Sequence, residues 1–143
     1  MGMTESFLLF CMEERRYALD VTDVERIVRA GEVTIVPDVP DFIRGLINVA
    51  GNIIPVIDMR RRLGLPIRDM VLSDRFILIN VASRLRALLV DGVEGVVELP
   101  TPSVTSLKTE VKEAIPTATM VDGNIVLIQS IEAFVFETAP FQV

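Results

Sequence analysis

The sequence predicts a mostly β protein made of two small barrels. Its 143 residues are 50% hydrophobic, which is enough apolar material for one domain core. The 8 Pro and 8 Gly interrupt the apolar runs, and this punctuation favours many short strands over a helix bundle. We expect about ten strands, and two small barrels that bury a shared face fit this number better than one large barrel.

The first two strands are predicted to form a hairpin. Residues 6–12 are mostly apolar, and the charged turn Glu13-Glu14-Arg15-Arg16 joins them to a second strand at 17–20. Cys11, the single cysteine, is expected to pack as a small buried hydrophobe, and one thiol cannot form an internal disulfide, which fits a reducing cytoplasm. Tyr17 has two interpretations, an interface anchor or a core ring with its hydroxyl at the rim.

A short helix is expected after this hairpin. Thr22 and Glu25 have the spacing of a capping box, and apolar residues recur at helical spacing between residues 24 and 28. Gly31 can supply the left-handed stop that ends such a helix. Residues 32–36 are then predicted to form another strand.

The run from residue 45 to residue 60 is the most informative segment. It predicts two strands over a turn at Ala50-Gly51-Asn52, and apolar residues occupy both faces of the hairpin. A sheet with one face in water would alternate apolar and polar residues, so the second face is covered either by the same chain or by a partner protein. Asp58 is expected to cap a short helix at 59–63 that ends at Gly64.

The rest of the chain continues as strands and turns. The expected strands are 75–82, 86–91, 93–99, 117–121 and 125–129. The last two flank Asp122-Gly123-Asn124, where glycine tolerates the positive φ of a hairpin turn. Residues 66–74 are predicted to form a loop, residues 100–116 an irregular crossing, and Ser130 is expected to cap a closing helix. No internal repeat is visible by residue identity.

The composition excludes several functions. The net charge is -6, and the acids dominate residues 91–143 while every Arg lies between Arg15 and Arg86. The acidic end, and aromatic residues without interleaved basic ones, argue against nucleic-acid binding, whereas the Arg-rich part suits an acidic partner. The chain has no His and no Gly-rich phosphate loop, so we expect no catalysis, no metal and no cofactor.

Two sets of charged residues have competing interpretations. Asp58 and Asp91 could be paired carboxylates for acid-base chemistry, but each follows an apolar strand and precedes a turn, which favours capping. Arg60-Arg61-Arg62 is either a docking patch for an acidic partner or a solvated helix face. The apolar run 7–12 is too short for a signal peptide or a membrane span, so we expect a soluble protein inside the cell with no membrane insertion.

Short motifs along nearly the whole chain resemble the CheW-like adaptors of bacterial chemotaxis. In chain order the matching segments are Phe7-Leu8-Leu9-Phe10, Tyr17-Ala18-Leu19, Val24-Glu25-Arg26-Ile27, Val36-Pro37-Asp38-Val39-Pro40, Phe42-Ile43-Arg44-Gly45, Asn48-Val49-Ala50-Gly51, Ile54-Pro55-Val56-Ile57-Asp58-Met59-Arg60, Val90-Asp91-Gly92-Val93 and Leu127-Ile128-Gln129-Ser130-Ile131-Glu132. Each segment alone is unspecific, but their shared order and spacing argue against chance.

The resemblance implies a particular fold. It implies two small five-stranded, SH3-like barrels packed on a shared hydrophobic core, with short helices. The whole chain, 1–143, would be a single CheW-like domain made of two intertwined subdomains. One subdomain would cover roughly 14–82, and the other roughly 83–143 together with the strand 6–12.

The resemblance also implies a function. Such proteins are non-enzymatic cytoplasmic adaptors, recruited to membrane-associated receptor arrays, which couple the cytoplasmic tip of methyl-accepting chemoreceptors to the regulatory domain of a CheA-type histidine kinase. In isolation we expect a monomer or weak self-association. One alternative is a divergent accessory protein for another motility or signalling pathway with a different receptor, and another is an enzyme that uses carboxylates or a metal between the barrels.

The resemblance assigns partner-binding roles to residues around the central hairpin. These residues are Val24, Arg26, Arg44, Gly45, Val49, Ala50 and Ile53. Family members commonly have an acid where this chain has Arg26, and an Arg where it has Ala50. Either the chain recognises a different receptor tip or another partner, or both changes are neutral at a tolerant surface.

Overall fold

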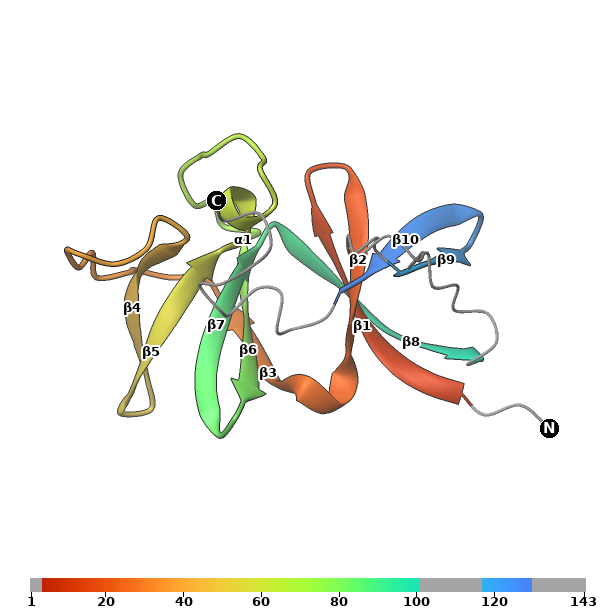
Figure 1. Ribbon diagram of the computed structural model, residues 1–143, viewed down its shortest axis with the longest axis horizontal. Helices are drawn as coiled ribbons and strands as arrows, with labels where there is room; N and C mark the ends of the chain where they lie inside the picture. Colours follow the sequence, from red (N-terminus) through yellow and green to blue (C-terminus); the bar gives the residue numbers. More distant parts are fainter. Residues whose placement is uncertain (1–3, 101–116, 130–143) are drawn as a thin grey trace, which may run out of the picture.

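The chain folds into two five-stranded sheets that stand side by side (Figure 1). The computed structural model describes residues 4–100 and 117–129. Sheet A has the strand order β8-β1-β2-β10-β9, and sheet B has the order β3-β6-β7-β5-β4. We call each sheet with the residues packed on it lobe A and lobe B. The predicted mostly β fold with two five-stranded units is confirmed.

The strands of sheet A are β1 (Thr4–Met12), β2 (Arg15–Asp20), β8 (Gly92–Pro100), β9 (Thr117–Val121) and β10 (Asn124–Ile128). The strands of sheet B are β3 (Val24–Arg29), β4 (Ile43–Val49), β5 (Asn52–Asp58), β6 (Arg75–Val81) and β7 (Arg84–Val90). A 3-10 turn, η1 (Val21–Asp23), precedes β3, and the helix α1 (Met59–Arg62) follows β5. Pro100, where the irregular crossing was expected to start, is the last residue of β8. The rest of that crossing, 101–116, and the helix expected after Ser130 lie outside the described residues.

The strands divide between the sheets differently from the expected subdomain ranges. The range 14–82 would place β2 with β3 to β6, yet β2 pairs with β1 in sheet A. The range 83–143 would place β7 with β8, yet β7 pairs with β6 in sheet B. Two-residue turns hold each of these hairpins within one sheet. The chain therefore passes from lobe B to lobe A at Asp91, between β7 and β8.

The predicted helix at 22–31 is wrong. Asp20, rather than Thr22, caps this segment by accepting a hydrogen bond from the Thr22 backbone N–H at 2.9 Å, and it caps only the single turn η1. Residues 24–29 are strand β3, which pairs with β6. Three of these six residues are Val or Ile, which favour a strand, and the backbone pairing with β6 outweighs the helical spacing.

The predicted strand at 32–36 is reduced to one bridge. The Thr34 N–H donates to the Leu46 carbonyl at 2.8 Å, and the Leu46 N–H donates to the Thr34 carbonyl at 2.9 Å. Thr34 follows β3, and Leu46 lies in β4, so the bridge joins the two edges of sheet B and closes it into a barrel.

The central hairpin and its helix are confirmed. Strands β4 and β5 flank the turn Ala50-Gly51, and Asp58 caps α1 by accepting the Arg60 backbone N–H at 3.0 Å. Gly64 has φ +72, as a left-handed stop requires. The last hairpin is also present, with Asp122-Gly123 as its turn.

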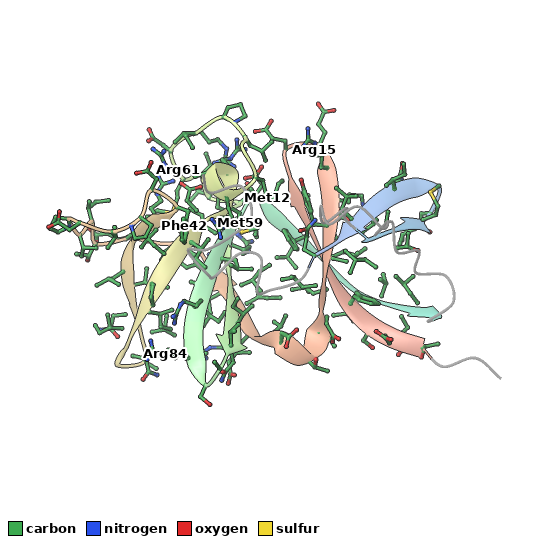
Figure 2. The ribbon with its side chains drawn as sticks, in the orientation of Figure 1. Met12, Arg15, Phe42, Met59, Arg61 and Arg84 are labelled. Atoms are coloured by element: carbon green, nitrogen blue, oxygen red, sulfur yellow. The ribbon has the colours of Figure 1, made fainter. Side chains whose placement is uncertain are left out.

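Three apolar clusters explain why both faces of the strands are hydrophobic. One cluster fills lobe A and another fills lobe B. The third lies between the sheets and joins residues of both lobes, including Met12 and Met59, which meet where the lobes adjoin (Figure 2). Along β1, Phe7 and Leu9 point into lobe A while Leu8 and Phe10 point into the shared cluster. The expected shared hydrophobic core is therefore present, and the same chain covers most of the second face.

The two lobes repeat one strand plan. In each lobe a hairpin, β1–β2 or β6–β7, lies beside a second hairpin, β9–β10 or β4–β5, through a parallel pairing. The registers agree, because Ile128 lies opposite Ala18 just as Val56 lies opposite Ala87.

This register aligns two identical patterns that sequence inspection missed. Arg-x-x-Ala-Leu occurs at 15–19 and again at 84–88, and Val-x-Gly-Asn-Ile occurs at 49–53 and again at 121–125. The expectation that the chain holds no repeat is therefore corrected. Each pattern is short, and the two copies occur in a different order along the chain, so only the strand pairing relates them.

A cluster of five charged residues ties the lobes together. We call Glu13, Arg60, Arg68, Asp74 and Asp91 the interlobe charge cluster. Asp91 accepts the Glu13 backbone N–H at 2.7 Å from lobe A. It also accepts Arg60 at 2.7 and 3.2 Å and Arg68 at 3.0 Å from lobe B. Arg60 also pairs with the Glu13 carboxylate, and Arg68 holds Asp74 with two bonds of 2.9 and 3.0 Å.

Asp74 is the most buried carboxylate of this cluster. Burial alone would raise its pKa, but the hydrogen bonds from Arg68 and the Val71 N–H, with the charges of Arg68 and Arg60, outweigh burial and hold the pKa below its ordinary value. The hydrogen bond to Asp74 likewise raises the pKa of Arg68. The folded state therefore favours the ionised carboxylate, and this stability is lost as the pH falls through the lowered pKa.

We predict that Asp74→Asn destabilises the protein by about 2 kcal/mol at pH 7, because Arg68 loses its charged partner in a buried setting. The difference from the wild type should begin to shrink as the pH falls below about 4, where the Asp74 carboxylate of the unfolded chain becomes protonated, and should vanish as the pH falls through the lowered pKa of the folded state. Urea unfolding at a series of pH values measures this difference. Asp69→Asn, at an exposed neighbour, is the control and should stay near the wild type throughout. A pH-independent difference for Asp74→Asn would contradict the prediction.

We predict that Gly45→Ala costs about 3 kcal/mol or more of unfolding free energy. Gly45 has φ +154, and a Cβ there would lie 2.2 Å from the Thr34 carbonyl oxygen that closes the barrel. Gly31→Ala is the matched control, because nothing lies within 4 Å of its added Cβ. Chemical denaturation compares the two variants, and equal stabilities would contradict the prediction.

Candidate protein-binding surface

Several of the predicted contact residues gather at one end of lobe B. The turn at 50–51 and the turn at 82–83 lie at this end, because β5 and β7 run parallel and each starts just after its turn (Figure 1). Val49, Ala50 and Ile53 belong to the first turn and its flanks. Val24 also lies toward this end, since it pairs with Ile79 near the end of β6.

A notch separates the two turns. Strands β5 and β7 pair only from Val56 and Ala87 onward, so their first residues diverge. Pro55 has no N–H to continue the ladder, which contributes to this divergence. The resulting notch has a volume of about 350 Å³. Its lining residues are Asn52, Ile53, Ile54, Pro55, Ser83, Arg84, Leu85 and Arg86. We call this space the lobe B notch.

The side chains at the notch combine exposed apolar surface with positive charge. Ile53 is 66% exposed, which is unusual for an isoleucine in a strand. Arg84 is exposed and forms no ion pair within the described residues. Among the residues that the structure describes, no acid lines the notch. These features suit a partner that presents an apolar side chain next to a carboxylate.

The hairpin tip beside the notch is held in a defined shape. Ala50 and Gly51 both have positive φ, +51 and +87, and the Asn48 side chain accepts the Gly51 N–H at 2.9 Å. Ala50 is exposed at the outermost point of the turn, so its methyl group offers little surface and no charge. Val49 is half-buried against the lobe B core.

The other predicted residues have different positions. Arg26 is exposed in the middle of the edge strand β3, and Val24 is half-buried against the shared core. Arg44 lies at the opposite end of β4 and donates to Asp58 at 3.1 Å. Gly45 is buried, and an added Cβ there would meet the backbone of Thr34, so the residue has a structural role while its expected partner contact stays a prediction.

The expected arginine patch on α1 is largely absent. Arg60 and Arg62 are each only 7% exposed. Arg60 belongs to the interlobe charge cluster, and Arg62 lies 4.1 Å from the centre of the Phe42 ring in a cation–π contact. Only Arg61 is exposed. Neither a three-residue docking patch nor a solvated helix face describes this segment.

Tyr17 and Cys11, the other residues that the sequence singled out, contribute to the folded structure. Tyr17 is 2% exposed and stacks on Phe10 with 5.5 Å between ring centres, so it is a core ring. Burial, with the charges of Glu94 and Asp91, raises the pKa of the Cys11 thiol, which keeps it protonated and unreactive. Among the described residues no group of three acidic, Cys or His side chains is placed to hold a metal ion.

Sequence reasoning missed the second wall of the notch. Ser83, Arg84 and Leu85 come from the β6–β7 hairpin, which the sequence indicated only as a strand pair. The signal available for them was the repeated Arg-x-x-Ala-Leu pattern. In the described residues, no helix has the length and apolar content needed to cross a bilayer.

The comparisons with known proteins agree with one another. A family model described as a CheW-like domain matches residues 6–138. The crystal structure of the scaffolding protein TtCheW from Thermoanaerobacter tengcongensis superposes with a TM-score of 0.80 at 30% sequence identity, and the match covers 90% of each chain.

Two curated relatives are chemotaxis proteins named CheW. The one from Klebsiella aerogenes is 32% identical over 66% of this chain, and the one from Bacillus subtilis is 32% identical over 71% of it. These matches span 57% and 65% of the relatives' own lengths, which is less than two thirds. The family model and the structural match together show that this chain belongs to the CheW-like domain family.

Proposed function

We propose that this protein is a non-enzymatic chemotaxis adaptor that couples chemoreceptors to a CheA-type histidine kinase. Membership of the CheW-like family, with a scaffolding protein as a structural match over 90% of the chain, is the observation that carries this proposal. The site itself suits a protein partner, because the notch pairs exposed apolar surface with positive charge.

The proposed mechanism of coupling depends on a rigid connection between the two lobes. An adaptor transmits a receptor movement to a kinase only if its own contact surfaces keep a fixed relation. The shared core and the interlobe charge cluster provide that fixed relation between the lobes. A contact of roughly 500 to 800 Å² on each partner suits modest, reversible binding.

The lobe B notch and its flanks form the proposed receptor-contacting surface. Val49, Ala50 and Ile53 contribute the tip, and Val24 and Arg26 extend the surface along β3. The partner is the cytoplasmic tip of a methyl-accepting chemoreceptor, and the regulatory domain of the kinase is the second partner. The protein would act in the cytoplasm and be recruited to membrane-associated receptor arrays.

A second candidate role keeps the fold and changes the partner. Arg26 and Ala50 stand where family members commonly carry an acid and an arginine, respectively, and both are exposed. An accessory protein of another motility or signalling pathway, with a different receptor, would show such changes, a reversed charge at Arg26 and a lost charge at Ala50. Binding measurements with a chemoreceptor hairpin and a kinase regulatory domain separate the two roles.

We predict that Ile53→Asp lowers the affinity for a chemoreceptor hairpin at least tenfold, because it places a charge at the centre of an apolar contact. Isothermal titration of the full chain with the hairpin measures this. Leu72→Asp is the matched control, since Leu72 is 98% exposed on the same lobe away from the notch. Equal affinities for the Ile53→Asp variant and the wild type would show that the notch is not part of the receptor-binding surface.

We predict that Ala50→Arg strengthens binding to a chemoreceptor tip that carries a carboxylate by about three- to tenfold, and that high salt abolishes the gain. Titrations at low and high salt measure both effects. Asp122→Arg places the same side chain at the equivalent turn of lobe A, where φ is +52, and should leave receptor affinity unchanged. An unchanged affinity for Ala50→Arg at low salt would show that the position does not contact the receptor.

A further inference from the structure

Two long loops of lobe B lie next to each other. The first is residues 30–42, between β3 and β4, and the second is residues 63–74, between α1 and β6. The Ala30 N–H donates to the Asp74 carbonyl at 3.2 Å, which joins the start of the first loop to the end of the second. We call them the first and second lobe B loops.

The second loop has an unusual arrangement of polar and apolar side chains. Its Arg68 turns toward the interlobe charge cluster, where it bonds to Asp74 and Asp91. Its apolar residues face solvent instead, with Ile67 49% exposed and Leu72 98% exposed. A loop that only linked α1 to β6 would expose mainly polar side chains. The outer surface of this loop is therefore a candidate contact surface.

A hollow of about 350 Å³ lies between the two loops. Both loops contribute to its apolar wall, with Ile35 and Val39 from the first and Ile67 from the second. Ile35 is 74% exposed, and Val39 is also exposed. The three side chains line one space, so they form a patch rather than scattered surface residues, and such a patch is typical of a protein contact. We call this space the interloop hollow.

Four charged side chains line the interloop hollow, two of each sign. Arg44 donates to the buried Asp58 at 3.1 Å, so these two charges are neutralised within the protein. Asp41 and Arg61 are exposed. Among the described residues neither of them forms an ion pair, so the hollow presents one unpaired carboxylate and one unpaired guanidinium.

The charges outside the lining leave this balance in place. The other exposed acids of the two loops are Glu32, Asp38 and Asp69, and none of them lines the hollow. Solvent and salt screen such exposed charges from a contact inside the hollow. The charge that an occupant meets is therefore that of Asp41 and Arg61, which sums to zero.

This balance of charge distinguishes between possible occupants. A partner segment of a single sign would be attracted by one of Asp41 and Arg61 and repelled by the other. A second copy of this chain carries both signs around the same apolar wall. In a two-fold contact each surface meets itself, so Asp41 of each copy can face Arg61 of the other, and all four charges gain a partner.

We propose that the interloop hollow is a self-association site, covered by the same face of a second copy of the chain across a two-fold axis. Ile35, Val39 and Ile67 of each copy would cover the hollow of the other copy. Two pairs between Asp41 and Arg61 would flank this apolar centre.

The proposed dimer leaves the lobe B notch open. Arg44 and Asp58, which line the hollow, lie at the ends of β4 and β5 that are remote from the turn at 50–51. Figure 2 shows Arg61, at the hollow, and Arg84, at the notch, at opposite ends of lobe B. Each dimer would therefore present two notches. This inference goes beyond the proposed function, and neither of them depends on the other.

The test is sedimentation equilibrium of the full chain between about 5 and about 500 µM, a range that suits a weak, reversible contact. We expect a monomer–dimer equilibrium. Ile35→Asp should weaken the dimer at least tenfold, because it places a charge in the apolar centre. Ile125→Asp is the matched control, since Ile125 is an isoleucine of similar exposure, 65%, in lobe A. It should leave the dimer unchanged.

Charge exchange tests the two-fold arrangement itself. Arg61→Asp should weaken the dimer at least tenfold, because two carboxylates then face each other on both sides of the contact, and Asp41→Arg should do the same with two guanidinium groups. An equimolar mixture of the two variants should dimerise again, since each mixed dimer regains two pairs of opposite charge. This rescue also shows that both variants are folded.

Three results would overturn the proposal. They are a wild-type chain that stays monomeric over the whole range, a dimer that survives Ile35→Asp, and a mixture of the charge variants that stays monomeric. A dimer that Ile125→Asp or Ile53→Asp dissociates would also overturn it, because the contact would then lie at an end of the molecule outside the hollow.

Titration with a chemoreceptor hairpin reports on the proposed function separately. Ile35→Asp should bind the hairpin as the wild type does, because it leaves the lobe B notch intact. A hairpin that binds neither protein would count against the proposed function, while a dimer that Ile35→Asp dissociates would still support the self-association site.

Discussion

The constraint on which this structure depends is that each sheet buries both of its faces. A small barrel fills its interior with alternate side chains and leaves the other half of them facing outward. Here those outward residues, such as Leu8 and Phe10 of β1 and Ile77 and Ile79 of β6, pack against the opposite lobe. A lobe by itself would expose these outward-facing apolar side chains to water, and a barrel of this size has only a marginal core. The fold is therefore one cooperative unit with two ends.

The interlobe charge cluster fixes the orientation of the two lobes at that apolar contact. Hydrophobic burial is not directional, so it brings the lobes together without fixing their relative rotation. Asp91 stands at the crossing between the lobes and is bound by Glu13 on one side and by Arg60 and Arg68 on the other. These contacts have defined geometry and are partly shielded from solvent. An adaptor needs a fixed orientation between its lobes, because it acts only by holding its partners in a defined geometry.

The wrong expectations share one physical cause. Residues 24–29 have helical spacing, but the free edge of β6 offers backbone hydrogen bonds that a short isolated helix cannot match. Arg60 and Arg62 were expected at a surface, yet Asp91 and Phe42, both distant in sequence, draw them inward. In each case the deciding partner lies far along the chain.

The sequence by itself determined the class of fold, the positions of most strands and turns, the cap at Asp58 and the family, because these depend on local propensity and on the order of motifs. It also placed Ala50 and Ile53 at an exposed tip. Only the tertiary structure decided which hairpin belongs to which lobe, which arginines are buried, and that Arg84 completes the notch beside Ile53. It alone related Ile125 to Ile53, since 72 residues of chain separate them and only the parallel strand pairing in each lobe gives them the same position.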